Sequence, residues 1–335
     1  MISFSFLKVI TFMALLISNV SVLCAGQLER FHFRKPVMGT EFQIICYAED
    51  KDSAEKAAEL AFAKAMEIEK ICSDYKRDSE VRQLKGVATK KLSSTLTDVL
   101  TTALAIAKET DGAFDPTIGH HSLNWRRAKA RGKLPTAESI QLAKQHTGWQ
   151  KISVSKNGAF KTSIAELRID LGGIAKGYAA DKMLEVLAEH KITHAMIAAG
   201  GDLRLGNSPP NAKGWKVGLK NLKTISDKHI TYLILSDCAI STSGDLHQFV
   251  EINGTRYSHI VNPQTGLGLT NRVSATVIAP TASQSDPLAT AACISKNTAT
   301  KLLASQDGIK LLLVTKAGEK ITTQQSATFP NTLKK

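Results

Sequence analysis

The chain has 335 residues, of which 43% are hydrophobic and 22% are charged. These proportions are ordinary for a soluble globular protein and exclude a disordered or fibrous chain. The formal net charge is +13, but the basic residues are spread out except for a run from Arg126 to Lys133. No aromatic residues interleave with that run, so it predicts a solvated basic loop and not a nucleic-acid interface.

The first 25 residues differ from the rest of the chain. Lys8 is their only charge, the apolar run 9–23 follows it, and small residues from Cys24 end it. This is the layout of a secretory signal peptide, and the run is short for a membrane span. We therefore expect a periplasmic protein in which residues 26–335 form one unit. A lipid anchor on Cys24 is the alternative, although the three residues before it are not the small ones usual there.

Four further cysteines are widely spaced: Cys46, Cys72, Cys238 and Cys293. They form no C-x-x-C pair, so neither a zinc site nor a dense disulfide framework is indicated. We expect them to be buried thiols.

The first half of the mature chain is expected to be mainly helical. β-like runs predict two strands before the helices, at about 28–35 and 40–47, on either side of a turn at 36–39. Apolar residues at helical spacing predict three helices, at about 52–72, 96–107 and 136–147. The first should begin with a capping box at Asp52 and Glu55 and pack by its alanine face.

Strands dominate the second half. They are predicted on both sides of the turns at Asn157-Gly158 and Asn253-Gly254, and at about 169–170, 194–199, 215–221, 230–235, 273–279 and 309–315. Two helices interrupt them, one ending near 190 and one at 286–294 with Pro287 in its first turn. A polar tail closes the chain. Helices early and strands late, without regular βαβ alternation, predict an α+β fold of mixed sheets with helices packed on them.

The stretch 169–181 is predicted to be a strand, a glycine turn and the start of a helix. Gly172 and Gly173 have no Cβ, so their main chain can approach a ligand closely. The helix start offers free N–H groups to an anion, and Lys176 adds positive charge. If these residues stood alone, an αL turn beside an exposed lysine would be the better explanation.

Two further positions carry side chains suited to chemistry. Asp286 and Thr290 stand four residues apart on one face of a predicted helix, and their hard oxygen atoms suit Mg²⁺ and not zinc. His259 follows a hairpin strand and could move a proton at neutral pH. Taken alone, Asp286 is better explained as a helix cap and His259 as a structural histidine.

Two apparent motifs fail on spacing. His120-His121 has no acidic or cysteine partner at ligand spacing. Gly200-Gly201-Asp202 follows a strand but lacks the G-x-G-x-x-G order of a dinucleotide-binding turn. Neither predicts a site by itself.

Eight motifs follow one another along the mature chain: 37–40; 73–75 with Ser79-Glu80; 112–119 with Asn124-Trp125; 170–178; 200–202; 241–245; 257–260 with Pro263 and Thr265-Gly266; and Asp286 with Thr290. Together they resemble those of the FAD:protein FMN transferases, a family of flavin transferases. Each motif is weak alone, but eight in order cover nearly all of the chain after the signal peptide.

The resemblance implies a role for each matching residue. FAD would be contacted by Met38, Tyr75, Ala113, Phe114, Asp115, Asp170, Lys176 and Ile260. Mg²⁺ would be held by the carbonyl of Gly173 and the side chains of Asp286 and Thr290. His259 matches a histidine thought to assist the transfer. The family fold is α+β, with FAD in a cleft between the two halves of one unit.

The implied reaction is consistent with these residue types. A hydroxyl of an acceptor flavoprotein, on threonine or serine, would attack phosphorus in the pyrophosphate of FAD, and AMP would leave. Such a reaction needs charge neutralisation and positioning more than covalent help from the protein. Mg²⁺, the glycine turn and Lys176 would neutralise charge, and His259 would take the proton.

This sequence departs from the family pattern at three places. Asn262 stands where an aspartate is usual, Pro287 where an alanine is usual, and His120-His121 where small residues or proline are usual. None removes a proposed ligand. The change at Asn262 could weaken whatever orients His259.

Two alternatives to the transferase stay open. With water as the nucleophile the same site would be an FAD pyrophosphatase that makes FMN and AMP, and without turnover it would be an FAD-binding protein. Membrane association is expected only through a partner or a lipid anchor.

Overall fold

The computed structural model describes residues 28–85, 88–219, 231–244 and 248–334. The predicted signal peptide, Cys24 and the last residue of the 241–245 motif lie outside these ranges. Within them, no helix is both long enough and apolar enough to span a bilayer.

The main sheet has eight strands in the order β1-β2-β6-β7-β10-β13-β14-β15. Their bounds are β1 (Glu29–Val37), β2 (Thr40–Ala48), β6 (Ala195–Ala199), β7 (Asp202–Leu205), β10 (Cys238–Gly244), β13 (Arg272–Ala279), β14 (Lys310–Ala317) and β15 (Lys320–Gln325). Every neighbouring pair is antiparallel. The last strand corrects the predicted polar tail: β15 lies at the sheet edge with every residue exposed, so it carries no alternating apolar signal.

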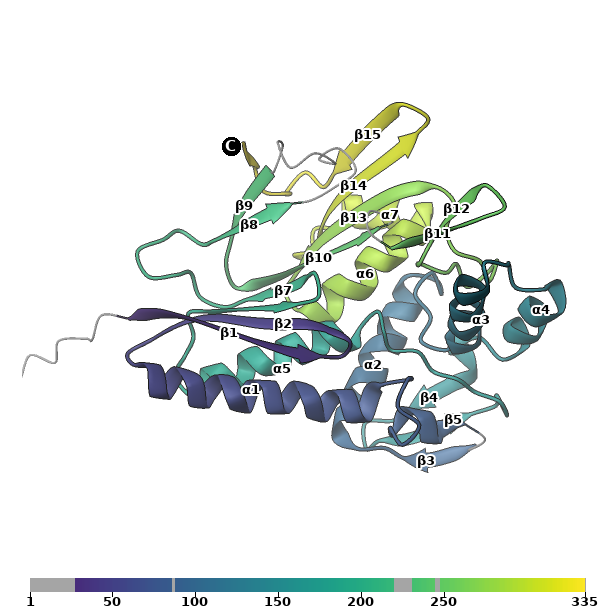
Figure 1. Cartoon of the computed structure of the whole chain (residues 1–335), viewed down its shortest axis with the longest axis horizontal. Helices are drawn as coiled ribbons and strands as arrows, with labels where there is room; N and C mark the ends of the chain where they lie inside the picture. The colour runs from purple at the N-terminus through teal and green to yellow at the C-terminus, as the bar shows by residue number, and fades with distance from the viewer. Residues whose placement is uncertain (1–27, 86–87, 220–230, 245–247, 335) are drawn as a thin grey trace, which may run out of the picture.

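Alternate residues of the central strands enter two different cores. In β13, Val277 belongs to the larger core and Ile278 to the smaller one, and in β14 the same holds for Leu311 and Leu312. Successive side chains of a strand point to opposite faces, so the sheet is covered on both sides. The helices cover one face, and a small sheet covers the other (Figure 1).

The helical layer contains α1 (Lys51–Cys72), α2 (Ser94–Glu109), α5 (Ala175–Glu189), α6 (Ala282–Ile294) and α7 (Lys296–Ala304). The alanine face of α1 is buried, as predicted. The capping box predicted at Asp52 was wrong, because Asp50 caps the helix by accepting from the Ser53 amide at 2.8 Å. The start of α6 was also wrong: the helix begins at Ala282, so Pro287 lies inside it and not in its first turn.

The opposite face is covered by β8 (Trp215–Leu219), β9 (Thr231–Leu235) and β16 (Leu333–Lys334). A separate hairpin is formed by β11 (Phe249–Ile252) and β12 (Thr255–Ser258), whose turn has Asn253 and Gly254 at positive φ, as predicted. The described cysteines are free thiols, all buried except Cys238, which is half-buried.

Residues 81–162 contain most of the remaining elements. They are η1 (Val81–Leu84), β3 (Thr89–Lys91), α3 (Gly119–Arg131), α4 (Ala137–Gln145), η2 (Trp149–Lys151), β4 (Ile152–Val154) and β5 (Ala159–Thr162). The predicted basic loop is wrong, because residues 126–131 belong to α3. This helix buries His121, Trp125 and Ala128, whose helical spacing was hidden among charged neighbours.

The predicted strand at Asp170 is also wrong. This residue lies in a segment outside the named helices and strands, and its amide donates to the Pro116 carbonyl at 2.8 Å. The amide of Gly119 donates to the Arg168 carbonyl in the same way. The segment is therefore fixed against the 113–119 loop and not in a sheet.

Candidate active site

A cavity of about 770 Å³ lies where α6, β10 and the glycine turn face α3 and the 113–118 loop. It is lined by eleven of the twelve residues to which the sequence assigned roles: Tyr75, Ala113, Phe114, Asp115, Asp170, Gly173, Lys176, His259, Ile260, Asp286 and Thr290. They come from segments up to about two hundred residues apart in the chain. The structure therefore gathers in one cavity most of the residues that the sequence analysis singled out.

Met38 is the exception. It occupies the β1–β2 turn with a φ of 53° and packs against the larger core, and it is not among the lining residues. Positive φ is uncommon for a residue with a side chain and fits the tight hairpin turn that Met38 shares with Gly39.

One end of the cavity is formed by α6 and the glycine turn. Asp286 and Thr290 are one helical turn apart, and both side chains line the cavity. A Cβ built on Gly173 would lie 3.9 Å from Thr290 Oγ1 and 3.3 Å from the Phe114 ring. The backbone at Gly173 therefore comes close to the hydroxyl because glycine leaves this space open.

Asp286 is buried, and its Oδ2 atom finds no hydrogen-bond partner among the described residues. Burial, together with the charge of Asp202, raises the pKa of Asp286 to about 7, although Lys176 opposes this shift. The Lys176 Nζ atom lies 3.7 Å from Asp286 Oδ2 and 3.9 Å from Asp202 Oδ2. Asp286 Oδ2 therefore has an ion-pair contact but no hydrogen bond, and a cation bound at this oxygen would satisfy it.

These donors fit Mg²⁺. No group of three or more His, Cys, Asp or Glu side chains that could hold a metal occurs in the described ranges. A metal here would thus depend on the Thr290 hydroxyl and the Gly173 carbonyl beside the Asp286 carboxylate, and Mg²⁺ accepts such oxygen ligands while keeping several waters. The Ser243 hydroxyl lies 3.0 Å from Thr290 Oγ1 and supports its position.

Lys176 lies in the first turn of α5, as predicted, and its Nζ atom donates to the Gly172 carbonyl at 2.9 Å. The charge of Asp286 is the largest influence on the pKa of Lys176, which is raised, so the side chain is a cation at neutral pH. It supplies positive charge to the cavity beside the glycine turn.

His259 follows β12 and is exposed on the cavity wall. Its Nδ1 atom lies 3.1 Å from the Gln248 carbonyl, which can only accept, so this nitrogen carries a proton. In the neutral ring the Nε2 atom then holds the lone pair and can accept a proton. Asn262 stands where an aspartate was expected, and its side-chain oxygen accepts from the Gln264 amide at 2.8 Å.

Asp115 lines the cavity, yet its carboxylate is engaged by the protein itself. Oδ1 accepts from the amide and hydroxyl of Thr117 at 2.8 and 2.6 Å, and Oδ2 accepts from the Trp149 amide at 3.2 Å. Burial raises its pKa. Asp115 thus shapes the 113–118 loop.

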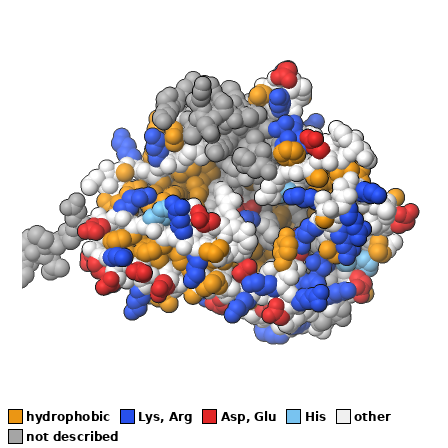
Figure 2. Space-filling view, in the orientation of Figure 1, with side chains coloured by type: hydrophobic (Ala, Val, Ile, Leu, Met, Phe, Trp, Pro, Cys, Tyr) orange, Lys and Arg blue, Asp and Glu red, His pale blue; other side chains and the backbone are white. Residues whose placement is uncertain are grey.

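Several lining residues were not predicted from the sequence, among them Arg126 and Lys129 of α3. In Figure 2, Lys and Arg side chains gather over α3 beside this part of the molecule. The helical spacing of His121, Trp125 and Ala128 is the signal that could have placed Arg126 next to the cavity.

The ApbE family model matches residues 38–313 of this chain. The FAD:protein FMN transferase of Salmonella typhimurium is 29% identical over 304 residues, which cover 87% of this chain and 86% of that protein. The Vibrio cholerae protein of the same name is 28% identical over 320 residues, 93% of this chain and 95% of that one.

Solved structures agree with the sequence comparison. The flavin transferase ApbE from Vibrio cholerae superposes with a TM-score of 0.79 at 26% identity, over 90% of this chain and 98% of that one. The ApbE protein from Thermotoga maritima gives a TM-score of 0.78 at 27% identity with the same coverage. The range matched by the family model contains every residue that lines the cavity, and the chain belongs to the ApbE family.

Proposed function

We propose that this protein is a Mg²⁺-dependent FAD:protein FMN transferase, which attaches FMN through a phosphoester to a threonine or serine of a target flavoprotein and releases AMP. The relatives that carry this name support the reaction class. The observation that carries the proposal is the cavity that brings Asp286, Thr290 and Lys176 to the glycine turn, with His259 on the same wall.

The residues of the cavity divide the work of phosphoryl transfer. Lys176 and the backbone of the glycine turn would bind the pyrophosphate of FAD. Asp286, Thr290 and the Gly173 carbonyl would hold Mg²⁺, which neutralises phosphate charge when bound. The protein thereby fixes the phosphorus in line with the entering hydroxyl.

His259 would act on the acceptor. As the hydroxyl oxygen forms its bond to the phosphorus on the riboflavin side, the bond from that phosphorus to the bridging oxygen breaks, and AMP departs with the electron pair. The hydroxyl proton passes to Nε2 of His259, which the Gln248 carbonyl holds in the required tautomer. The exposed position of the ring suits a nucleophile that arrives on another protein.

Measurement of AMP tests this proposal against its alternatives. Residues 26–335 would be incubated with FAD and Mg²⁺, with and without an exported flavoprotein from the same cell. A transferase releases AMP only with the acceptor. Equal AMP release without the acceptor would identify a pyrophosphatase, and bound FAD with no AMP would identify a binding protein.

We also propose that the protein acts in the periplasm after removal of its first 25 residues, with a lipid anchor on Cys24 as the alternative. The charge and apolar pattern of this segment supports export. The intact mass of protein from the periplasmic fraction tests it: a mass beginning at residue 26 or nearby is expected, and a mass with an added lipid at Cys24 would favour the anchor.

A further inference from the structure

We propose that Arg126 is a positioning residue that holds Tyr75 as a stacking platform for one flat ring of FAD and couples this platform to the glycine turn through Asp170. The inference rests on the proposed function, because it concerns how the same cavity binds FAD. Either flat ring of FAD, the isoalloxazine or the adenine, can stack on Tyr75, and the test distinguishes the two.

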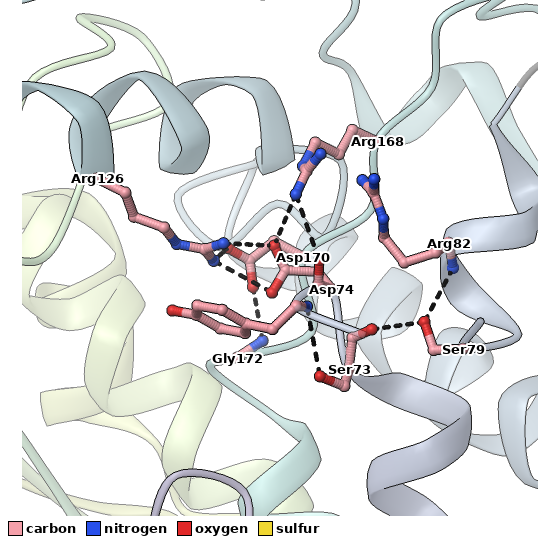
Figure 3. A network of polar contacts seen from close by, with 9 residues as sticks. Ser73, Asp74, Ser79, Arg82, Arg126, Arg168, Asp170 and Gly172 are labelled. Carbon is pink, nitrogen blue, oxygen red and sulfur yellow. Dashed lines mark hydrogen bonds and ion pairs between the residues drawn. The ribbon is translucent and has the colours of Figure 1, made fainter. Parts of the chain in front are cut away.

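Arg126 joins three segments that are distant in the sequence (Figure 3). From α3 its guanidinium reaches the Asp74 carboxylate with two contacts, Nη1 to Oδ2 at 2.8 Å and Nη2 to Oδ1 at 3.2 Å. Nη2 also lies 3.3 Å from Asp170 Oδ2. Asp74 follows the end of α1, and Asp170 precedes the glycine turn. A paired contact of this kind fixes the plane of the guanidinium as well as its position.

The position of Arg126 is determined by burial of its partner. The Asp74 side chain is only 4% exposed, so its charge must be compensated within the protein. Arg168 supplies a second contact, at 3.4 Å from Asp74 Oδ2. Because a buried carboxylate without its partner is strongly unfavourable, Arg126 has one well-defined arrangement at the cavity wall.

This arrangement places the guanidinium of Arg126 against the ring of Tyr75. The guanidinium carbon of Arg126 lies 4.0 Å from the centre of the Tyr75 ring. The residue is nevertheless 75% exposed and lines the cavity, so most of the ring surface is available to a ligand. A flat ring that stacks on an aromatic side chain gains affinity, and a cation on that side chain holds it in place at little entropic cost.

The same guanidinium is linked to the phosphate end of the cavity. The Oδ2 atom of Asp170 accepts from Arg126, and its Oδ1 atom accepts from the Gly172 amide at 2.8 Å. The Gly172 carbonyl in turn accepts from Lys176. Arg126 therefore keeps the platform for the ring at a fixed separation from the groups that face the pyrophosphate, which favours a ligand with both parts.

The neighbouring Arg127 provides a matched control. It has the same side chain and lies on the same helix, but it is exposed and outside the cavity lining. The two arginines therefore contribute the same charge to α3. Only the contacts to Asp74, Asp170 and Tyr75 distinguish them.

The test is a set of equilibrium dissociation constants for FAD, FMN and ADP. Arg126→Lys keeps the charge but loses the paired, planar contact, and we expect its Kd for FAD to rise about ten-fold, the range of one stacked ring. Tyr75→Ala should give a similar rise, and the double variant should bind no worse than Tyr75→Ala. Arg127→Lys should bind like the wild type. In Arg126→Lys the KM for FAD should rise by a larger factor than kcat falls.

A second variant guards against loss of the fold. Asp74→Asn with Arg126→Gln removes both charges of the closest pair, while Asp170 keeps the Gly172 amide and Arg168 keeps the Asp74 backbone carbonyl as partners. This double variant should weaken FAD binding as Arg126→Lys does, with a thermal midpoint close to that of the wild type. A loss seen for FMN but not for ADP would place the isoalloxazine on Tyr75, and the reverse would place the adenine there; either supports the proposal.

Two results would overturn the inference. Wild-type affinity for FAD in Arg126→Lys, or effects of Arg126→Lys and Tyr75→Ala that add in the double variant, would show that Arg126 does not act through Tyr75. These results leave the proposed function intact. A wild type that binds none of the three ligands would instead refute the proposed function and this inference together.

Discussion

The environment of Asp286 is the clearest indication that a ligand binds in the cavity. Its carboxylate is buried beside Asp202 and Lys176, and its Oδ2 atom has no hydrogen-bond partner in the described part of the chain. A pKa raised to about 7 means that the fold itself disfavours the charged form. A cation at Oδ2 would remove this penalty.

Replacement of Asp286 by alanine should therefore remove Mg²⁺-dependent turnover without loss of the fold. We expect AMP release to fall by about a hundred-fold or more, as for loss of a catalytic metal. The fold should survive, because Lys176 keeps Asp202 as a charged partner at 3.9 Å. Unchanged AMP release that still responds to Mg²⁺ would refute the assignment of Asp286 as a ligand.

His259 is expected to affect turnover and not binding. In His259→Ala we expect kcat to fall by about 10²-fold or more, the usual contribution of a general base, with the Kd for FAD unchanged. His190→Ala is the control, since His190 is also exposed and its Nδ1 atom also contacts a carbonyl, that of Val186 at 2.9 Å. Equal kcat values for both variants would exclude His259 from the proton transfer.

At this scale the sequence predicted which residues meet in the cavity better than it predicted what each one does. Motif order was sufficient to assemble Asp286, Thr290 and His259. It could not show that the Asp115 carboxylate is engaged by Thr117 and the Trp149 amide, because those contacts depend on how the loop folds back.

At the scale of elements, the site depends on how α6 is held against α5. Asp181 of α5 is buried and accepts from the amides of Ala282 and Ser283, at 2.8 and 2.9 Å, at the start of α6. Arg204 Nε lies 3.0 Å from the same carboxylate. A Cβ on Gly177 would collide with the Ala282 backbone, so the two helices can approach only with glycine there.

Removal of this anchor should weaken both the fold and the site. We expect Asp181→Ala to lower the free energy of unfolding by about 3 kcal/mol, since it leaves Arg204 and the first turn of α6 without their partner. Mg²⁺-dependent turnover should fall too, because α6 carries Asp286 and Thr290. Chemical denaturation and the AMP assay measure the two effects.

The cap of α4 provides the comparison for this variant. Thr136 accepts from the Ser139 amide at 3.2 Å on the exposed side of the molecule, so Thr136→Ala should cost about 1 kcal/mol and leave turnover unchanged. Equal effects of Thr136→Ala and Asp181→Ala on both quantities would mean that the contact between α5 and α6 has no special part in the site.

Element type was predicted well where one periodicity dominated, and poorly where tertiary contacts decided. The alanine stripe of α1 and the apolar run of β13 were recognised directly. The helix α3 was missed, because its buried face of His121, Trp125 and Ala128 is interrupted by charges that reach Asp74 and Asp170 only in the folded chain. The start of α6 was missed because its cap, Asp181, comes from another helix.

For the whole molecule, stability in acid should depend on His121. Its ring is fully buried, and neither nitrogen has a hydrogen-bond partner among the described residues. Burial lowers the pKa of His121 from 6.5 to about 4, so the folded state keeps the ring neutral while the unfolded state takes up a proton. This contribution to stability is complete above pH 6.5 and is lost as the pH falls towards 4.

Replacement of His121 by glutamine should flatten this dependence. Between pH 6.5 and pH 4 we expect the wild type to lose about 3 kcal/mol more stability than His121→Gln, at 1.36 kcal/mol per pH unit. Urea denaturation at several pH values gives the slope, which is compared instead of the absolute stability. Parallel slopes for the two proteins would show that His121 titrates normally in the folded state.

The α+β class was predicted from the order of the elements, but the arrangement that creates the cavity was not. Eight antiparallel strands pair in an order that places β10 between β7 and β13, and β15 joins at the edge without an apolar signal. Long-range pairing of this kind is decided by the fit of whole surfaces and not by local periodicity. Resemblance to a family, and not spacing, was what predicted a cleft between two halves.

The most direct test of the whole proposal is the intact mass of an exported flavoprotein from the same cell, after incubation with residues 26–335, FAD and Mg²⁺. We expect a gain of one FMN less one water on a single threonine or serine, matched by one AMP. No mass gain would contradict the transferase when the same mixture contains bound FAD and released AMP, because the enzyme would then hydrolyse FAD without passing FMN to a protein.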